Sequence, residues 1–148
     1  IDFGGATYVD DYKSSTVNTR QYRAPEVILG LGWCKPSDMW SVGCIISELY
    51  QGELLFATHD NMEHLALMER CIGYFPRRMV KKSPNGPKYF NSFLESRWRK
   101  SCSEESRDHI REMPPIEKLV LKNDRSTLGK LLKKLLTLDP VKRITASD

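Results

Sequence analysis

The chain has 148 residues, of which 40% are hydrophobic and 28% are charged. This composition is typical of a globular protein able to bury a core, and it excludes a disordered or fibrous one. The formal net charge of +4 does not by itself indicate a nucleic-acid partner, because scattered surface lysines give the same sum. No apolar run reaches the roughly 18 residues of a membrane-spanning helix, so we expect no membrane segment.

The cysteines Cys34, Cys44, Cys71 and Cys102 are widely spaced. They form no Cys-x-x-Cys pair and have no nearby histidine pair of the zinc-finger type, which favours a reduced, intracellular protein. Two disulfides remain formally possible from the even count. Cys44, however, lies in the most apolar helical stretch, where a buried free thiol is common.

A long loop is predicted from residue 1 to about residue 31. This stretch is rich in Gly, Ser, Thr and Asp and has no sustained apolar period. We expect it to close in a short helix near Pro25 to Leu29. Loops of this length are usually functional.

The strongest helical pattern covers residues 36–51. Pro36 suits a first helical turn, Ser37 or a neighbouring residue is the expected cap, and Gly52 is the expected stop. Apolar residues lie on all sides of this segment, which predicts a helix buried on most faces. We therefore expect it to be the central helix of the fold.

Two more helices are predicted, over residues 60–73 and 126–138. Asp60 and Glu63 are spaced as a capping box for the first, which should end near Gly73. In the second, leucines recur at three-four spacing with lysines on the other side, and Pro140 ends the pattern.

The stretch from about residue 75 to residue 123 has no persistent period and reads as an insert. We expect it to pack on the helices through its aromatic residues Tyr89, Phe90, Phe93 and Trp98. It also carries two basic clusters, Arg77, Arg78, Lys81 and Lys82, then Arg97, Arg99 and Lys100. Such clusters are usually solvated surface, with RNA binding or nuclear import as the alternative. No RNA-binding motif accompanies them, so we expect no direct nucleic-acid binding.

Five short motifs follow one another along the chain: Asp2-Phe3-Gly4, Ala24-Pro25-Glu26, Asp38-Met39-Trp40-Ser41-Val42-Gly43, Glu63-His64-Leu65-Ala66-Leu67-Met68-Glu69-Arg70 and Asp139-Pro140-Val141-Lys142-Arg143. In this order they resemble the second half of a protein-kinase catalytic domain. The octet at 63–70 differs by a single Met-to-Leu step from the signature of the LAMMER, or CDC-like, kinases.

The resemblance implies a mainly α fold, the C-terminal lobe of a protein kinase truncated at both ends. Residues 1–148 would be a partial kinase domain in which residues 2–26 form the activation segment. The glycine-rich loop, the ATP-pairing lysine and the His-Arg-Asp loop would precede Ile1. We therefore expect the isolated chain to be inactive.

The resemblance also assigns roles near the N-terminus. Asp2 would bind the Mg²⁺ of Mg-ATP, Phe3 would pack into the domain, and Gly4 would let the backbone turn away. Thr19 would hydrogen-bond the catalytic aspartate and its neighbouring lysine.

The run Gln21-Tyr22-Arg23 would shape the substrate pocket. Gln21 stands where we expect histidine in close CDC-like relatives, which leaves the details of that pocket open.

Further residues are implied to be structural. Glu26 and Arg143 would form a buried ion pair. Asp38 would accept hydrogen bonds from the catalytic-loop backbone or, as an alternative, would interact with the dipole at its own helix N-terminus. Glu63, His64 and Arg70 would make fixed polar contacts that orient their helix and the insert.

By the same resemblance, the protein would use ATP and Mg²⁺ to phosphorylate serine and threonine, and tyrosine by autophosphorylation. Substrates would be arginine- and serine-rich splicing factors, which Asp10 and Asp11 could contact, unless these residues are only part of a solvated loop. A monomer is expected, in the nucleus, with the cytoplasm as a second location. SR-protein kinases are the nearest enzymatic alternative, and a catalytically inactive scaffold is the alternative of another class.

Overall fold

The computed structural model describes residues 3–120 and 127–148. Within these ranges the regular structure is helical, with one isolated β-bridge between Phe90 and Ser96. The elements are η1 (Arg20–Tyr22), α1 (Pro25–Ile28), α2 (Lys35–Gln51), α3 (Asn61–Ile72), α4 (Arg77–Lys82), α5 (Gly86–Tyr89), α6 (Trp98–Ser101), α7 (Glu104–Glu112), η2 (Ile116–Lys118) and α8 (Leu128–Leu135). The mainly α fold class is therefore confirmed.

Helix α2 begins and ends as its sequence predicts, except at the cap. Pro36 lies in the first turn, and Gly52 adopts a left-handed φ of 80° while its N–H bonds the carbonyl of Glu48. Ser37 is not the cap, because its place inside the first turn directs its hydroxyl to Glu26, 2.8 Å away. Cys34 occupies the cap position without a side-chain hydrogen bond.

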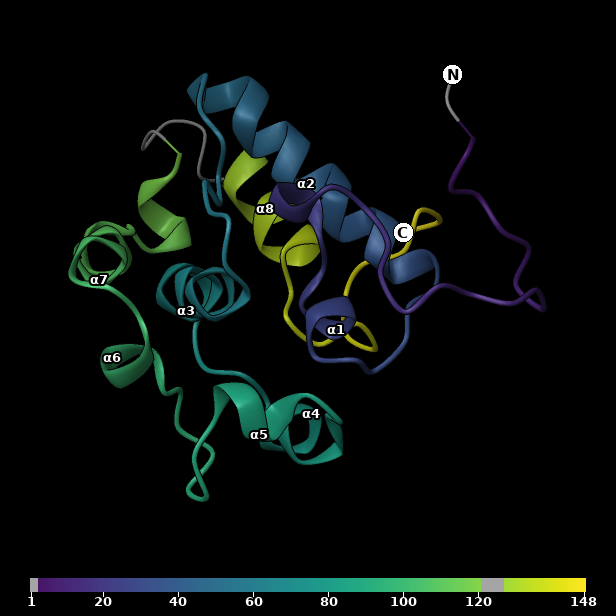
Figure 1. The fold of residues 1–148 in the computed structure, drawn as a ribbon. Coiled ribbons are helices and arrows are strands. Elements are labelled where there is room, and N and C mark those ends of the chain that lie inside the picture. Colours follow the sequence, from purple (N-terminus) through teal and green to yellow (C-terminus); the bar gives the residue numbers. More distant parts are fainter. Residues whose placement is uncertain (1–2, 121–126) are drawn as a thin grey trace.

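One face of α2 is buried, but another is not. Trp40, Gly43 and Cys44 are buried, and α8 packs beside this face (Figure 1). Val42, Ile45 and Leu49 are 40%, 44% and 80% exposed. The prediction of burial on most faces is thus wrong here. Residues three or four apart share a helix face, and no described element covers the stripe that these three form.

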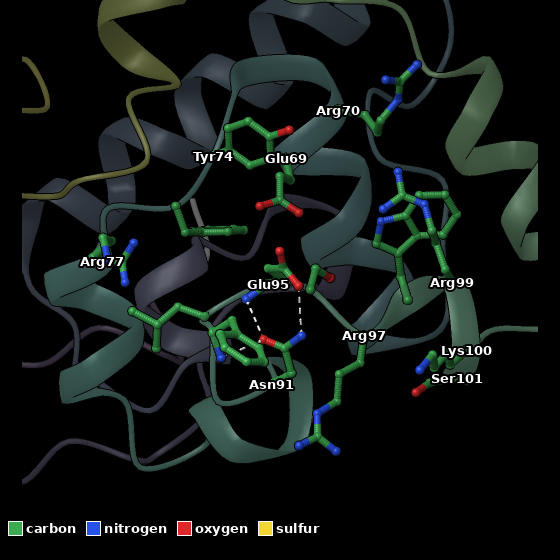
Figure 2. A pocket seen from close by; sticks show the side chains of 15 residues that line it. Glu69, Arg70, Tyr74, Arg77, Asn91, Glu95, Arg97, Arg99, Lys100 and Ser101 are labelled. Atoms are coloured by element: carbon green, nitrogen blue, oxygen red, sulfur yellow. Dashed lines mark hydrogen bonds between the residues drawn. The ribbon is translucent and has the colours of Figure 1, made fainter.

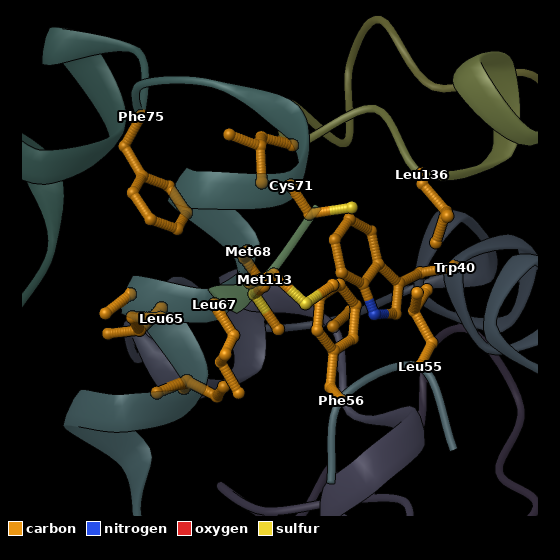
Figure 3. Packing of buried hydrophobic residues seen from close by; sticks show 14 of the residues in the cluster. Trp40, Leu55, Phe56, Leu65, Leu67, Met68, Cys71, Phe75, Met113 and Leu136 are labelled. Carbon is orange, nitrogen blue, oxygen red and sulfur yellow. The ribbon is translucent and has the colours of Figure 1, made fainter. Parts of the chain in front are cut away.

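Helix α3 lies at the centre of the core, with every residue from Met62 to Met68 buried. Its packing partners are α7 and α6 on one side and α1 on another (Figure 1). Figure 3 shows Leu65, Leu67 and Met68 of α3 in the same cluster as Trp40 and Phe56. The rings of Trp40 and Phe56 stack with centroids 6.0 Å apart.

The start of α3 is only half of a capping box. The Asp60 side chain accepts hydrogen bonds from the N–H groups of Met62 and Glu63, as the sequence predicts. Glu63 does not return the bond. The N–H of Asp60 instead donates to the Thr58 hydroxyl at 3.2 Å, and that hydroxyl donates to Glu63.

The predicted insert consists of the short helices α4 to α7 and η2, and residues 121–123 of it lie outside the described residues. Phe90 and Trp98 are buried, and Phe90 meets Phe75 edge to face. Phe93 is 76% exposed, because it lies in the turn between the two bridged residues and points away from the core. Its predicted packing role is therefore wrong.

Helix α8 occupies the middle of the segment predicted at 126–138, of which residue 126 lies outside the described residues. Leu132, Leu135 and Leu136 are buried, while Lys130 and Lys134 are exposed on the other side. In the described part of the chain, no helix combines the length and apolar character that crossing a membrane requires.

Candidate functional site

Residues 3 to about 16 lie outside the packed helices (Figure 1). Asp2 lies outside the described residues, so its role as a magnesium ligand stays a prediction. Phe3 is 80% exposed, and its expected packing into the domain is wrong for this structure. The cause is the course of the segment, which lies on the surface and gives Phe3 no apolar site to enter. Gly4 is also exposed.

The described residues do not contain a group of three or more His, Cys, Asp or Glu side chains that could hold a metal ion. A magnesium ion held by Asp2 would therefore need ligands from elsewhere, such as the phosphates of ATP. The expectation that the protein binds ATP and Mg²⁺ therefore depends on the motif at residues 2–4. It does not depend on a binding site formed by the described helices.

Loop residues 17–23 are anchored by a network of hydrogen bonds. Arg23 donates to the carbonyls of Val17, at 3.0 Å, and Asn18, at 2.9 Å. Asn18 adopts a left-handed φ of 63° and its side chain donates to Ser41 of α2 at 2.8 Å. Burial, together with the charge of Arg20, lowers the pKa of Arg23. The Arg23 guanidinium therefore fixes the backbone of this loop through the two carbonyls that it bonds.

Tyr22 and Gln21 fasten the next turn to the core. The Tyr22 hydroxyl donates to Glu48 at 2.7 Å, which is the main reason that the pKa of Tyr22 is raised. Its carbonyl accepts from the Ser41 hydroxyl at 2.8 Å. The Gln21 amide donates to the carbonyl of Thr58 at 3.3 Å. The three residues predicted at a substrate pocket thus lie together on one rigid support.

Thr19 sits at the start of η1 with its side chain exposed. Its carbonyl accepts the N–H of Tyr22 at 3.0 Å, and the neighbouring Arg20 side chain hydrogen-bonds Asn61 at the start of α3. The hydroxyl is thus available to a further part of the protein. Its contact with a catalytic aspartate stays a prediction.

Beneath this loop, Glu26 and Arg143 form a buried bidentate ion pair. The oxygen–nitrogen distances are 2.7 and 2.8 Å, and the two side chains are 3% and 0% exposed. Arg143 also lies over the ring of Trp40, 5.2 Å from its centroid. The pair joins α1 to the chain end across 117 positions of sequence, so it fixes the loop relative to α2.

Asp38 is exposed in the first turn of α2. This position agrees with a carboxylate that interacts favourably with the helix dipole. Acceptance of hydrogen bonds from a catalytic loop stays a prediction, because no such loop is part of this sequence.

Glu63 and Arg70 of the octet make the polar contacts expected of them. Glu63 is held by the Thr58 hydroxyl and by Nδ1 of His109 on α7, 2.9 Å away. Arg70 donates to the carbonyl of Arg111, also on α7, at 3.3 Å. These contacts orient the insert on α3.

His64 does not make such contacts, and that expectation is wrong. The ring is fully buried against Phe56, with centroids 5.4 Å apart, and neither nitrogen has a hydrogen-bond partner among the described residues. Its position on α3 turns it toward the apolar core. Burial, with smaller effects from Arg20 and Arg23, lowers the pKa of His64 to about 3, so the ring is neutral.

Sequence reasoning missed several residues that hold this site. Ser37 of α2 donates to Glu26, and Ser41 of α2 donates to the carbonyl of Tyr22 in the loop. Glu48 accepts the Tyr22 hydroxyl. The carbonyl of Thr58 accepts the Gln21 amide, and the Thr58 hydroxyl donates to Glu63. Serine and threonine give no local signal for such contacts. Only the spacing of Ser37 and Ser41 by one helical turn could have pointed to a shared polar face.

The model of the family described as "Protein kinase domain" matches residues 1–148. The dual specificity protein kinase lkh1 of Schizosaccharomyces pombe is 43% identical over 152 residues, covering all of this chain and 22% of that protein. The human dual specificity protein kinase CLK1 is 44% identical over 150 residues, again covering all of this chain and 30% of that protein. The serine/threonine-protein kinase AFC2 of Arabidopsis thaliana is 44% identical, with 36% of its length covered.

A crystal structure of a kinase domain superposes with a TM-score of 0.92 at 45% sequence identity. The match covers 99% of this chain and 43% of the other. The chain thus spans about a fifth to about a third of the curated relatives named here.

Proposed function

Because the chain belongs to the protein kinase family, and within it to the LAMMER, or CDC-like, kinases, we propose that the protein containing it transfers the γ-phosphate of ATP to serine and threonine, and to its own tyrosine. The observation that carries the proposal is the support under residues 17–26. Arg23, Tyr22 and Glu26 fix this loop to α2 and to the chain end through buried or partly buried bonds. Phosphoryl transfer depends mainly on positioning and charge neutralisation, and a rigid loop suits the first requirement.

In this mechanism Asp2 would hold the magnesium ion of Mg-ATP, which would supply charge neutralisation at the phosphates. The other residues of this chain act on the protein substrate. Gln21 to Arg23 present a fixed surface, because the Arg23 guanidinium is occupied by two backbone carbonyls and Tyr22 by Glu48. The Thr19 hydroxyl is exposed at the edge of this surface, where it would meet the catalytic loop.

The proposal is tested with the full-length protein and its Asp2→Asn variant. Phosphorylation of a serine peptide should fall by orders of magnitude in the variant, while its melting temperature stays the same. An Asp148→Asn variant, changed at an exposed carboxylate near the chain end, is the matched control. If the unaltered protein transfers no phosphate, the scaffold alternative replaces this proposal.

We further propose that the substrates are arginine- and serine-rich splicing factors. Asp10 and Asp11 are both exposed on the loop, where their carboxylates can reach substrate arginines. Asp11 accepts a hydrogen bond from the N–H of Tyr8 at 3.3 Å, which holds the turn that carries both residues.

The test is the Michaelis constant of the Asp10→Asn/Asp11→Asn double variant. It should rise several-fold for an arginine-rich peptide and stay constant for a serine peptide without arginine. An unchanged constant for the arginine-rich peptide would remove these residues from recognition.

Nuclear residence, which the same family resemblance supports, is tested by microscopy of the tagged full-length protein.

A further inference from the structure

One cavity of the described residues lies between α3 and the insert, away from residues 17–26. Its volume is about 910 Å³, within the range of ligand sites. It is lined by the end of α3, the segment after it, the turn at residues 91–97 and helix α6. We name this cavity the insert groove. Figure 2 shows its side chains, with Glu69 and Tyr74 facing Asn91 and Glu95 across the opening.

The insert groove is basic. Its lining includes five cationic side chains and two carboxylates: Arg70, Arg77, Arg97, Arg99 and Lys100 against Glu69 and Glu95. These cations come from three separate parts of the sequence and meet only in the fold. Arg77 stands on one side of the opening, while Arg70 and Arg99 stand on the other (Figure 2).

Two of the four arginines have side chains that are available to a ligand. Among the described residues, no hydrogen bond or salt bridge occupies the guanidinium groups of Arg77 and Arg99. Arg99 is nevertheless held in place, because it lies over the ring of buried Trp98, 4.8 Å from the centroid. A planar guanidinium with its N–H groups available can bind two oxygens of a phosphate at once.

One of the two carboxylates, Glu69, opposes an anion less than a fully charged carboxylate would. Burial raises the pKa of Glu69 to about 7, so this side chain carries only part of a negative charge near neutral pH. Glu95 accepts a hydrogen bond from Asn91 at 2.9 Å. The net character of the groove therefore remains cationic.

Exposed aromatic rings complete the surface. Tyr74 is 90% exposed and Phe93 is 76% exposed, and both line the groove. Large exposed aromatics beside a cavity are typical of protein-interaction surfaces, where they cover the apolar parts of a bound peptide. The groove therefore combines cations that can bind a phosphate group with aromatic rings that can contact the peptide chain next to it.

We propose that the insert groove binds a phosphorylated peptide segment, with Arg77 and Arg99 as its phosphate ligands. The inference rests on the proposed function, because the kinase reaction itself produces phosphorylated chains. A substrate with several acceptor serines would then be retained through a residue already modified while another enters the site. RNA has the same phosphate chemistry, but the groove lies on an enzyme whose product is a phosphopeptide.

The test is binding to the full-length protein, measured by fluorescence anisotropy. The probes are a labelled peptide with two phosphoserines, its unphosphorylated counterpart, and a single-stranded RNA of similar length. The phosphopeptide should bind at least tenfold more tightly than the other two. The Arg77→Ala/Arg99→Ala variant should lose at least tenfold in this affinity.

Lys81→Ala/Lys82→Ala is the matched control. It removes two exposed cations from the last turn of α4, and neither of them lines the groove. Equal affinity for both peptides, tighter RNA binding, or an equal loss in the control would overturn the inference. Phosphorylation of a short peptide with a single serine is measured in parallel and should be the same in both variants. Activity without phosphopeptide binding refutes only this inference, whereas an inactive unaltered protein refutes the proposed function.

Discussion

Removal of Arg143 should be the most destabilising single change at the buried ion pair. All five of its N–H donors are used. Two bond Glu26, at 2.7 and 2.8 Å, and the others bond the carbonyls of Pro36, Thr137 and Leu138 at 2.7, 2.9 and 3.3 Å. Arg143→Ala would leave Glu26 buried with only the Ser37 hydroxyl as a bonding partner among these groups.

The expected cost is roughly 3–5 kcal/mol, because breaking a buried pair leaves one charge desolvated. For a chain of this size that corresponds to a fall in melting temperature of about 6–20 °C. Urea unfolding followed by circular dichroism gives the free energy directly. The control is Arg111→Ala, whose partner Asp108 and own side chain are 58% and 60% exposed, so it should cost at most about 1 kcal/mol.

The double variant Glu26→Leu/Arg143→Met tests the same reasoning from the other side. Replacing both charges by apolar groups of similar size is often neutral, so this variant should be more stable than Arg143→Ala. Equal unfolding free energies for Arg143→Ala and Arg111→Ala would refute the argument. The argument would also be refuted if the double variant lost as much unfolding free energy as the two single substitutions lose together.

Three further changes test the core and the insert groove. His64→Leu should melt at the same or a higher temperature, because no hydrogen bond is lost, whereas a loss above about 2 kcal/mol would show that the ring nitrogens are bonded. Burial gives Glu69 a pKa of about 7 against an ordinary 4.5, so its stabilising effect is complete below about pH 4.5 and is lost as pH rises through 7. Glu69→Gln should flatten that profile by about 1–2 kcal/mol, after allowance for solvent exposure, and parallel profiles would contradict it. Gly43→Ala should destabilise by about 1–3 kcal/mol, since its Cβ would lie 2.9 Å from Leu136, whereas Gly5→Ala, with open space around it, should not; equal melting temperatures would reject the packing argument.

Local signals in the sequence set the positions of the main helices. Pro36 and Gly52 mark the start and end of α2, and Asp60 marks the start of α3, because proline, glycine and a capping carboxylate act within one turn of their own position. The motif containing Glu26 and the one containing Arg143 also predicted a pair 117 positions apart, which the structure contains. That prediction came from resemblance to a family and not from any local pattern.

Other features depended on contacts between distant segments. The sequence by itself determined the family, the helical fold and the main helix bounds, because these follow from motifs and short-range chemistry. Only the tertiary structure decided that His64 enters the core without a hydrogen bond, that Phe3 and Phe93 are exposed, and that cations from separate parts of the sequence line one groove. The physical reason is that burial and charge clustering are set by which surfaces meet when the helices pack, and the short-range pattern around a residue does not reveal which distant surface it will meet.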